Sequence, residues 1–416
     1  MRAFCALATT LFWALAAHAA ESSTPLSALL NEAVQRNPDI LAARRAWQAA
    51  TQVSSQVSTM PDPEVTVQQL SVGSPRPFSG FSNSDFAYIG FGVSQDFPFP
   101  GKLKLKGEAA ERDAAITRQK LESLRRSILQ QVKEAYFQLA YIQQTLGVLD
   151  RNDKLLEQIE KIADARYRVG QGNQQDVLKT QLERTKLQRE LVHHHDVMQT
   201  QEALLRKLLN RAADSSEVTT ETLVETPLSF TINDLLARVR TANPEVAAQR
   251  EMINRQSLQV EMARKDRYPD FSAQYMWQHT AEQFRDYYVL SVSARIPIYR
   301  RRRLNPEMTQ AVEELERSRR EYESQAQSAF FEVRNQYIAA ETASQMLKIY
   351  REGLIPQALA TYQSGLTAYQ TGHLDFESLL SGFMDVLNFD EEYWKALADH
   401  ETALSRIEQL TGVSFR

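Results

Sequence analysis

The sequence consists of two similar halves, and this duplication constrains the fold more than any other feature. Four motifs occur in the same order in residues 21–210 and in residues 231–416. They are Asn37-Pro38 and Asn243-Pro244, Pro61-Asp62 and Pro269-Asp270, Pro98 and Pro297, and Tyr167-x-x-Gly170 and Tyr369-x-x-Gly372. The spacing also agrees, since 40 residues separate Gly170 from Asn210 and Gly372 from Gly412. The chain is therefore predicted to fold as two structural repeats.

Each repeat is predicted to contain a helix, two strands, a very long helix, a turn and a further helix. In the first repeat the strands are expected at about 62–72 and 86–97, and the last two helices at about 102–169 and 174–210. In the second repeat the strands are expected at about 270–279 and 286–297, and the last two helices at about 305–368 and 374–412. Residues 211–230 are expected to connect the two repeats.

Residues 1–20 have the pattern of a secretory signal peptide. Arg2 precedes an apolar run that ends in Ala17-His18-Ala19, which suits cleavage by signal peptidase near Ala19 or Ala20. An uncleaved membrane anchor is the alternative, but the run is short for a membrane span. The single cysteine, Cys5, lies inside this segment, so the exported chain is expected to contain no thiol. The formal net charge of −4 is too small to indicate a nucleic-acid partner.

The expected helices are unusually long. No proline interrupts 102–169, and apolar residues recur there every three or four positions. At ~1.5 Å per residue such a helix extends about 100 Å, which is too long for the core of a globular domain. It must pack along similar helices. Apolar residues in 374–412 follow heptad spacing, which indicates coiled-coil packing of that kind.

The expected strands have one apolar face and one polar face. Apolar and aromatic side chains alternate with Gly, Ser and Gln in three of the four strands. The residues expected to face lipid are Ile89, Phe91, Val93, Tyr275, Trp277, Leu290, Val292 and Ile296. Strands of this length and alternation in an exported protein are typical of a transmembrane β-barrel. A soluble hairpin would alternate as well.

Four strands cannot close a barrel around water. An open sheet in lipid leaves unpaired backbone groups, and a barrel of eight strands is filled by its own side chains. At least three subunits are therefore needed for an aqueous pore. The alternative from another class is a soluble periplasmic coiled-coil scaffold whose hairpins cap pairs of helices. That protein would need polar hairpin faces on both sides, which the apolar positions within 89–93 and 290–296 contradict.

Basic residues follow both pairs of strands. Lys102, Lys104 and Lys106 occupy this position in the first repeat, and the four arginines of 300–303 occupy it in the second. Each cluster lies where a strand would leave the membrane, so it suits contact with anionic lipid headgroups. A solvated charge run at the start of a helix explains the same residues equally well.

The chain resembles the TolC-like outer-membrane factor family, the exit ducts of tripartite efflux pumps. The resemblance covers the mature chain and rests on the duplicated Asn-Pro helices, the strand pairs, the turn segments 167–178 and 369–380, and Leu410-Thr-Gly412. It implies a mainly α protein with a transmembrane β-barrel. In this arrangement three identical copies form one twelve-stranded barrel in the outer membrane, and their helices continue it as an α-helical tunnel through the periplasm.

The resemblance also implies partners and a mechanism. The helix–turn–helix tips at Val169, Gly170, Thr371 and Gly372 would bind a periplasmic adaptor protein. An inner-membrane RND pump would supply the energy, and the duct would conduct its cargo passively after the helices untwist at the periplasmic end. Glycine at each tip suits a tight reversal of the chain, although it would cap a helix in either case.

Three short motifs resemble the branch of the family that serves heavy-metal efflux pumps. They are Met60-Pro-Asp-Pro63, Gln95-Asp-Phe-Pro-Phe-Pro-Gly-Lys102 and Asp375-Phe-Glu-Ser-Leu-Leu380. This resemblance implies export of heavy-metal cations, with drug efflux and type I secretion as the alternatives. The family carries rings of carboxylates at its periplasmic gate. Because Ser378 and Ser381 occupy the matching positions, Asp176 and Asp385 are the candidate gate residues.

The sequence indicates neither an enzyme nor a cofactor. It has no complete phosphate loop, no H-E-x-x-H motif and no evident Ser/His/Asp grouping. His193, His194 and His195 are consecutive, and on a helix their side chains point in different directions. We therefore expect no metal site at these histidines.

Overall fold

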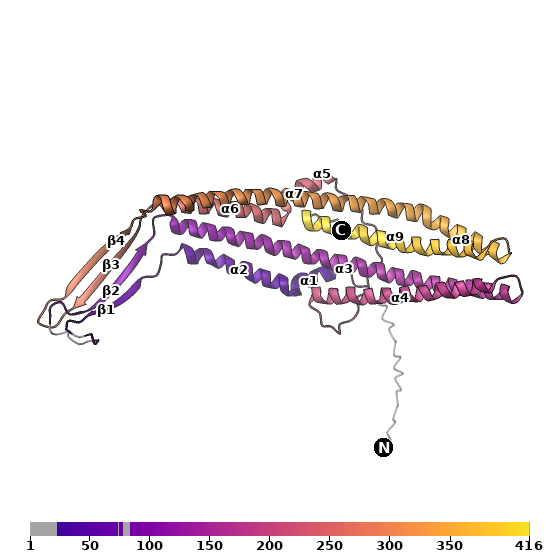
Figure 1. Cartoon of the computed structure of the whole chain (residues 1–416), viewed down its shortest axis with the longest axis horizontal. Helices are drawn as coiled ribbons and strands as arrows, with labels where there is room; N and C mark the ends of the chain where they lie inside the picture. Colours follow the sequence, from indigo (N-terminus) through magenta and orange to yellow (C-terminus); the bar gives the residue numbers. More distant parts are fainter. Residues whose placement is uncertain (1–22, 74, 78–83, 416) are drawn as a thin grey trace, which may run out of the picture.

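The protein is an elongated molecule with a small sheet at one end and a long helical body (Figure 1). The computed structural model describes residues 23–73, 75–77 and 84–415. The expected signal peptide, with Cys5, lies outside the described residues. No described helix has an apolar stretch long enough to cross a membrane.

The elements of the two repeats follow the same order. The first repeat contains α1 (Leu26–Arg36), α2 (Pro38–Ser58), β1 (Glu64–Leu70), β2 (Tyr88–Phe97), α3 (Lys102–Arg168) and α4 (Gln174–Leu209). The second contains α5 (Ile232–Ala242), α6 (Pro244–Lys265), β3 (Asp270–His279), β4 (Tyr287–Arg295), η1 (Arg300–Leu304), α7 (Asn305–Ile349), η2 (Tyr350–Leu354), α8 (Ile355–Gln370) and α9 (Phe376–Thr411).

Two helices begin each repeat where a single helix was expected. The side chain of Asn37 accepts hydrogen bonds from the backbone N–H groups of Asp39 and Ile40, so it caps α2 and separates it from α1. Pro38 then occupies the first helical position, where its missing N–H is not needed. The same local chemistry at Asn243-Pro244 separates α5 from α6.

The long helix expected at 305–368 is also not continuous. It contains the π-helical turn η2 between α7 and α8, next to Pro356. Proline has no N–H to continue the regular hydrogen-bonding ladder, and its ring displaces the carbonyl group of the preceding turn. A π-helical turn is one way in which a helix absorbs such a disruption.

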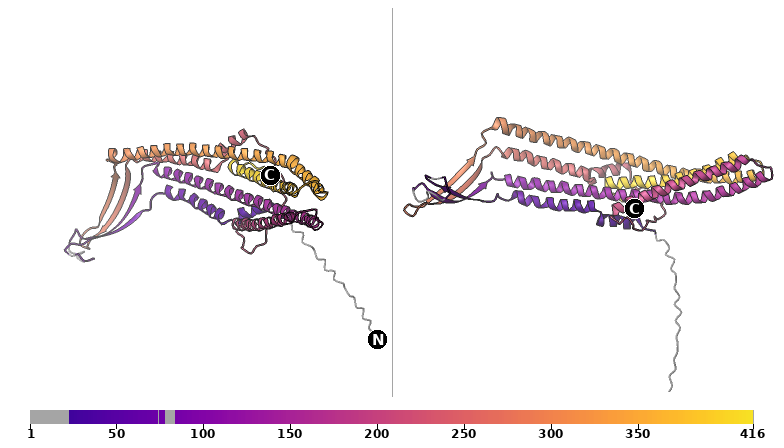
Figure 2. Two further views of the ribbon diagram at one scale, coloured as in Figure 1. Left: turned by 45° about the vertical axis from the view of Figure 1, so that its right-hand side comes forward. Right: turned by 60° about the horizontal axis from the view of Figure 1, so that its bottom comes forward.

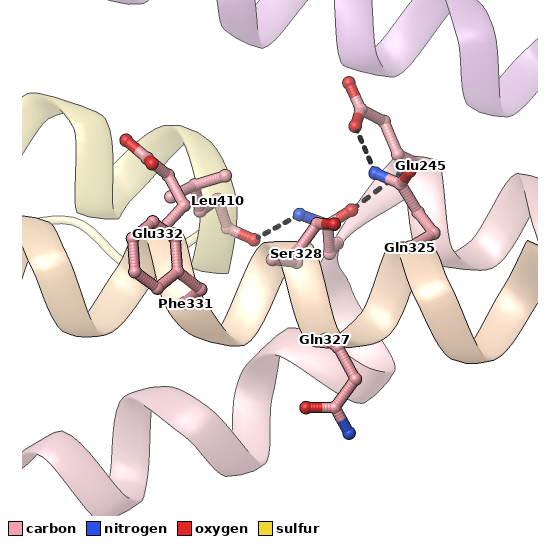
Figure 3. A pocket seen from close by; sticks show the side chains of 9 residues that line it. Glu245, Gln325, Gln327, Ser328, Phe331, Glu332 and Leu410 are labelled. Atoms are coloured by element: carbon pink, nitrogen blue, oxygen red, sulfur yellow. Dashed lines mark hydrogen bonds between the residues drawn. The ribbon is translucent and has the colours of Figure 1, made fainter.

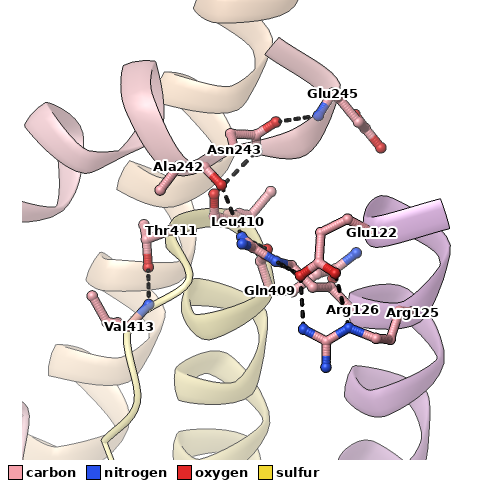
Figure 4. A network of polar contacts seen from close by, with 10 residues as sticks. All are labelled: Glu122, Arg125, Arg126, Ala242, Asn243, Glu245, Gln409, Leu410, Thr411 and Val413. Atoms are coloured by element: carbon pink, nitrogen blue, oxygen red, sulfur yellow. Dashed lines mark hydrogen bonds and ion pairs between the residues drawn. The ribbon is translucent and has the colours of Figure 1, made fainter. Parts of the chain in front are cut away.

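Both capping asparagines also join distant elements. The Nδ2 atom of Asn37 donates to the Leu208 carbonyl oxygen at the end of α4, 2.9 Å away. The Nδ2 atom of Asn243 donates to the Leu410 carbonyl oxygen at the end of α9, 3.1 Å away (Figure 4; Leu410 is also labelled in Figure 3). Both asparagines are buried. The repeated Asn-Pro motif therefore ties the first helix pair of each repeat to its last helix.

Most of the helical body is a curved wall one helix thick. Next to the sheet, α2, α3, α6 and α7 lie side by side in this order (Figure 2). In the other half of the body, α3 packs against α4 and α9, and α9 packs against α7 and α8. Such a wall buries apolar side chains between neighbouring helices, and α5 packs against α6, α7 and α9.

The buried core is divided along the wall. One cluster joins α1, α2, α3 and α4, a second joins α3, α4, α8 and α9, and a third joins α5, α6, α7 and α9. Representative residues are Leu29, Ile40, Tyr136 and Leu205 in the first, Leu156, Ile159, Phe383 and Leu387 in the second, and Leu235, Val333, Leu404 and Ile407 in the third.

Polar contacts hold the two repeats together at mid-height (Figure 4). The guanidinium of Arg126 pairs with Glu122 and donates a hydrogen bond of 3.0 Å to the Ala242 carbonyl oxygen at the end of α5. A Cβ atom at Gly412 would come within 3.0 Å of this guanidinium, and the backbone there has φ of +70°. Glycine is therefore the residue that fits at the end of α9.

The segment between α4 and α5 crosses the body and is anchored by buried polar groups. The Glu401 carboxylate accepts hydrogen bonds from the backbone N–H and the hydroxyl group of Thr226, at 2.7 and 3.0 Å. The ring nitrogens of His400 lie 2.9 Å from the Ala340 carbonyl oxygen and 2.8 Å from that of Thr226. These contacts fix the segment against α7 and α9.

Candidate functional site

The four strands form one antiparallel sheet in the order β1-β2-β3-β4. The central pair, β2 with β3, joins the first repeat to the second. The sheet therefore exists only because the two repeats pack side by side. Strands β1 and β4 are its edges, and each has one side without a strand partner within the described residues.

One face of the sheet is apolar in every strand. Residues paired across antiparallel strands lie on the same face, so the register defines rows that cross the sheet. One row is Val65, Val93, Tyr275 and Leu290, and the next is Val67, Phe91, Trp277 and Tyr288. The rings of Phe91 and Trp277 are stacked with their centroids 6.0 Å apart. Leu290 is 73% exposed, so none of the described residues covers this part of the apolar face.

The opposite face is mainly polar or small. Its rows are Glu64, Ser94, Gln274 and Ser291, then Thr66, Gly92, Met276 and Val289. A Cβ atom on Gly92 would lie 3.2 Å from the Cε atom of Met276, so glycine leaves the space that this methionine fills. The alternation expected from the sequence is thus aligned by the register into two chemically different faces.

The residues predicted to face lipid gather on the apolar face. Register places Ile89, Phe91, Val93, Tyr275, Trp277, Leu290 and Val292 there. Ile296 lies just beyond the end of β4 and is exposed. The sequence prediction missed Val65 and Val67 as members of the face, although their alternating positions in β1 carried the signal.

The two tips have the same backbone structure. In the first tip, between α3 and α4, the Gly170 N–H donates to the Tyr167 carbonyl oxygen and the Gln171 N–H to that of Arg166. In the second tip, between α8 and α9, Gly372 and His373 make the equivalent bonds. Gly170 has φ of +74° and Gly372 has φ of +81°. This is a Schellman cap, which places glycine at the left-handed position after the helix.

A network of side chains joins the two tips. The guanidinium of Arg166 lies over the ring of Tyr369, 4.7 Å from its centroid, and donates a hydrogen bond to the Tyr369 carbonyl oxygen. Arg166 also donates to the Gln171 carbonyl oxygen at 3.0 Å. The hydroxyl group of Tyr369 donates to Oδ2 of Asp176 at 3.2 Å. Lys179 and Glu377 form a further ion pair between α4 and α9.

The environment of Tyr369 favours its protonated form. Burial, together with the nearby Asp176 carboxylate, raises the pKa of Tyr369 to about 12. A neutral hydroxyl group that donates to a carboxylate is therefore the stable state well beyond neutral pH. The tips are held together by a bond that ordinary changes in pH leave intact.

The structure separates the two candidate gate residues. Asp176 belongs to the network between the tips, whereas Asp385 is exposed on α9 and takes no part in it. The sequence prediction did not include Arg166 or Tyr369. Tyr369 belongs to the duplicated Tyr-x-x-Gly motif, but its equivalent Tyr167 is exposed. The motif alone therefore could not indicate which tyrosine makes the contact.

The three consecutive histidines differ in exposure, although the ring centroids of His193 and His194 are 5.6 Å apart. His194 is buried with its ring edge-on to Tyr141, while His193 and His195 are exposed. Burial lowers the pKa of His194. No group of three or more metal-binding side chains comes together in the described ranges of the chain. His194 is thus a packing residue between α4 and its neighbours.

Comparisons with known proteins agree with this arrangement. The profile of the family described as "Outer membrane efflux protein" matches residues 29–211 and 235–413, which are the two repeats. The chain is 22% identical over 315 residues to the cobalt-zinc-cadmium resistance protein CzcC of Cupriavidus metallidurans. That alignment covers 75% of this chain and 74% of CzcC.

Solved structures share the fold at low sequence identity. The outer-membrane channel OprN superposes with a TM-score of 0.80 at 16% identity, covering 94% of this chain and 90% of OprN. CusC, whose structural description refers to folding and transmembrane channel formation, superposes with a TM-score of 0.80 at 14% identity. The superposition covers 94% of this chain and 93% of CusC. VceC of Vibrio cholerae superposes with a TM-score of 0.78 at 17% identity, covering 94% of this chain and 97% of VceC.

Proposed function

Because the chain belongs to the outer membrane efflux protein family, we propose that it is the outer-membrane exit duct of a tripartite RND-type efflux pump for heavy-metal cations. The protein is located in the outer membrane and extends into the periplasm. Its family consists of channels and not of enzymes. The single observation that carries the proposal is the sheet, which has one continuous apolar face and two edge strands without a further partner among the described residues.

Three copies of this sheet form one closed barrel. Each copy contributes four strands, and β4 of one copy pairs with β1 of the next. Closure is required because every backbone N–H and C=O in the hydrocarbon region must have a partner within the protein. The row through Tyr275 and Leu290 then faces lipid, and the row through Gln274 and Ser291 faces the water-filled interior.

The helical walls close in the same way. A wall one helix thick leaves the helices at its two lateral edges partly uncovered. Apolar side chains are exposed along both of these edges. They are Leu178, Leu182 and Val192 on α4, and Phe331, Ile338 and Ile349 on α7. Successive residues of each set are about one to three helical turns apart, which suits packing of helix against helix. In the trimer, α4 and α7 are the surfaces that meet the neighbouring copies.

The two tips are the docking surface for the periplasmic adaptor. They lie at the end of the body opposite the sheet (Figure 1), where the duct must meet the rest of the pump. Val169 is 67% exposed, and apart from Gly170 and its two chain neighbours no described residue has an atom within 4 Å of a Cβ placed on Gly170. The backbone of the first tip is thus open to close approach by a partner.

The closed state of the duct is held by contacts at the same end. Asp176, Tyr369 and Arg166 connect the α3–α4 hairpin to the α8–α9 hairpin within one copy. Separation of the hairpins widens the periplasmic end, and adaptor binding supplies the free energy for it. The duct itself conducts passively. We assign Asp176 to this gate, and Asp385 remains a proposed lining residue on α9.

Heavy-metal cations are the proposed cargo. The support is the similarity to CzcC, whose name refers to cobalt, zinc and cadmium, together with the three short motifs described above. A duct should release its cargo, so it needs no tight metal site of its own. The similarity to OprN and VceC concerns the fold and does not identify a cargo.

Survival of a deletion strain tests the cargo. The strain and its complemented form are grown with copper, silver, zinc, cobalt or cadmium salts, and with dyes and antibiotics. Sensitivity to metals alone, restored by complementation, is the expected result. Sensitivity to dyes and antibiotics would assign the duct to drug efflux, and loss of protein secretion alone would assign it to a secretion system.

A further inference from the structure

We propose that the second strand-to-helix junction, residues 296–303, binds the anionic headgroups of phospholipids in the periplasmic leaflet of the outer membrane. The inference rests on the proposed function in one respect, namely that the apolar face of the sheet lies in lipid. It adds a binding surface for a defined chemical partner, a phosphodiester at the end of an acyl chain.

The order of residues along this junction matches the order of layers in a membrane. Leu290 and Val292 lie on the apolar face of β4, and the chain then leaves the sheet toward the helical body (Figure 1). Ile296, Ile298 and Tyr299 follow, and their exposed fractions are 65%, 70% and 68%. The four arginines come next. Apolar, aromatic and basic residues thus follow one another from the hydrocarbon toward the headgroups.

The four arginines are free to bind an external anion. All of residues 300–303 are exposed, and within the described part of the chain no carboxylate forms an ion pair with any of their guanidinium groups. Most other exposed arginines on α7 do have such partners, as Arg317, Arg319 and Arg320 have with glutamates one turn away. The unpaired charge is therefore a feature of the junction.

The first repeat provides an internal comparison. Its equivalent junction contains Lys102, which pairs with Asp266 at 3.1 Å and with Asp270 at 3.0 Å. Lys104 lies 3.6 Å from Glu108. Among the described residues Lys106 has no ion-pair partner, so the first junction keeps one unpaired charge and the second keeps four. The sequence supported a lipid contact and a solvated run equally for both junctions, and the structure distinguishes them by their partners.

A groove beside the second junction suits an amphiphilic ligand. It has a volume of about 980 Å³ and lies between the end of β4 and the start of α7. Ile296, Ile298 and Tyr299 line it together with Arg302 and Arg303. Asp266, Asp270 and Glu307 also line it, and the first two are engaged by Lys102.

The chemistry of these residues favours a phospholipid. A guanidinium group can donate two parallel hydrogen bonds to a phosphate, which gives a directed contact in addition to charge. The exposed isoleucines offer apolar contact to the first part of an acyl chain. Inorganic phosphate would use only the arginines, whereas a phospholipid uses both parts of the surface.

The test measures which lipid contacts the protein. The full-length trimer is reconstituted in phosphatidylcholine bilayers that contain a trace of spin-labelled phosphatidylglycerol or spin-labelled phosphatidylcholine. Electron paramagnetic resonance gives the fraction of each label that is immobilised at the protein surface. The wild type should prefer phosphatidylglycerol by at least about fivefold, the effect of ~1 kcal/mol for one engaged basic residue. In 1 M NaCl this preference should largely disappear.

Substitution of the arginines identifies the surface. With Arg300→Gln, Arg301→Gln, Arg302→Gln and Arg303→Gln combined, the two labels should be immobilised almost equally. The control combines Arg317→Gln, Arg319→Gln and Arg320→Gln, which removes charge from the same helix about 20 Å further from the sheet. It should keep the wild-type preference. Replacement of the four junction arginines by lysine should keep most of it and shows that the altered junction still folds.

The outcomes separate this inference from the proposed function. If the wild type immobilises neither label, the sheet does not enter lipid and the proposed function fails. If both labels are immobilised without a preference, or if the glutamine variant keeps the preference, the proposed headgroup surface is wrong. The proposed function as a duct is unaffected by either result. A preference that is unchanged in 1 M NaCl would also overturn it, because the contact would not be ionic.

Discussion

The hydroxyl group of Tyr369 donates a hydrogen bond to Oδ2 of Asp176 over 3.2 Å, and this bond connects the end of α8 to the start of α4. Tyr369 is only 2% exposed, whereas Tyr167, its equivalent in the first repeat, is 45% exposed. Two tips with the same backbone thus carry different side-chain contacts. The tyrosine of the second tip therefore contacts the first hairpin, whereas the tyrosine of the first tip is exposed to solvent.

We expect Tyr369→Phe to favour the open state of the duct. The substitution keeps the ring and removes only the hydrogen bond, which contributes about 1.5 to 3 kcal/mol when the acceptor is a charged carboxylate. Single-channel recordings in planar bilayers should show a larger open probability at neutral pH. Tyr167→Phe removes the equivalent hydroxyl from the exposed tip and should behave as wild type. Equal open probabilities in all three proteins would contradict the gate assignment.

The contribution of Tyr369 to stability should depend on pH only under alkaline conditions. Burial and the Asp176 carboxylate raise the pKa of Tyr369 from 10.0 to about 12. In the unfolded chain the hydroxyl group titrates first, so its contribution is complete below about pH 10 and is lost as the pH rises through about 12. Thermal unfolding of the trimer should show this loss in the wild type and not in Tyr369→Phe. The difference between the two proteins should be constant between pH 6 and 9.

We expect Gly170→Trp and Gly372→Trp to abolish adaptor binding while leaving trimers in the outer membrane. Both positions have positive φ, where a side chain costs roughly 1–2 kcal/mol, and the indole would occupy the proposed contact surface. Gly147→Trp is the control, because Gly147 lies within α3 with open space around its Cβ position. Binding is measured by co-purification with the adaptor of the same pump. Normal efflux in both tip variants would disprove the docking assignment.

The two faces of the sheet should tolerate charge differently. Leu290→Arg places a charge on the apolar face, which costs about 2–4 kcal/mol near the middle of a bilayer. Ser291→Arg places the same charge one residue away, on the opposite face. The first variant should lose folded trimer in the outer membrane, and the second should keep it. Heat-resistant trimer on gels, quantified in outer-membrane fractions, gives the measurement. Equal amounts of both variants would mean that the face of Leu290 does not meet lipid.

The sequence predicted the features that depend on residues close together in the chain, namely the helix ends and the two faces of each strand. Gly170 and Gly372 end helices because glycine adopts positive φ without strain. This preference depends on one residue alone, so the sequence was enough to predict both turns. The alternation of Leu290 and Val292 with Ser291 and Ser293 assigns faces within a strand for the same local reason. The break between α1 and α2 was missed, although Asn37-Pro38 carries its signal, because the apolar periodicity continues across the cap.

The sequence by itself determined the repeated order of elements, the strand faces and the turns, since each depends on neighbours along the chain. Only the tertiary structure decided which residues from the two repeats meet. It placed β2 beside β3 and aligned their apolar rows. It also buried Tyr369 against Asp176 while leaving Tyr167 exposed, and paired Lys102 with Asp270 while leaving the arginines of 300–303 without a carboxylate partner in the described chain. Such contacts join residues that are far apart in sequence. They depend on how helices and strands pack against one another, and a local sequence pattern does not contain that information.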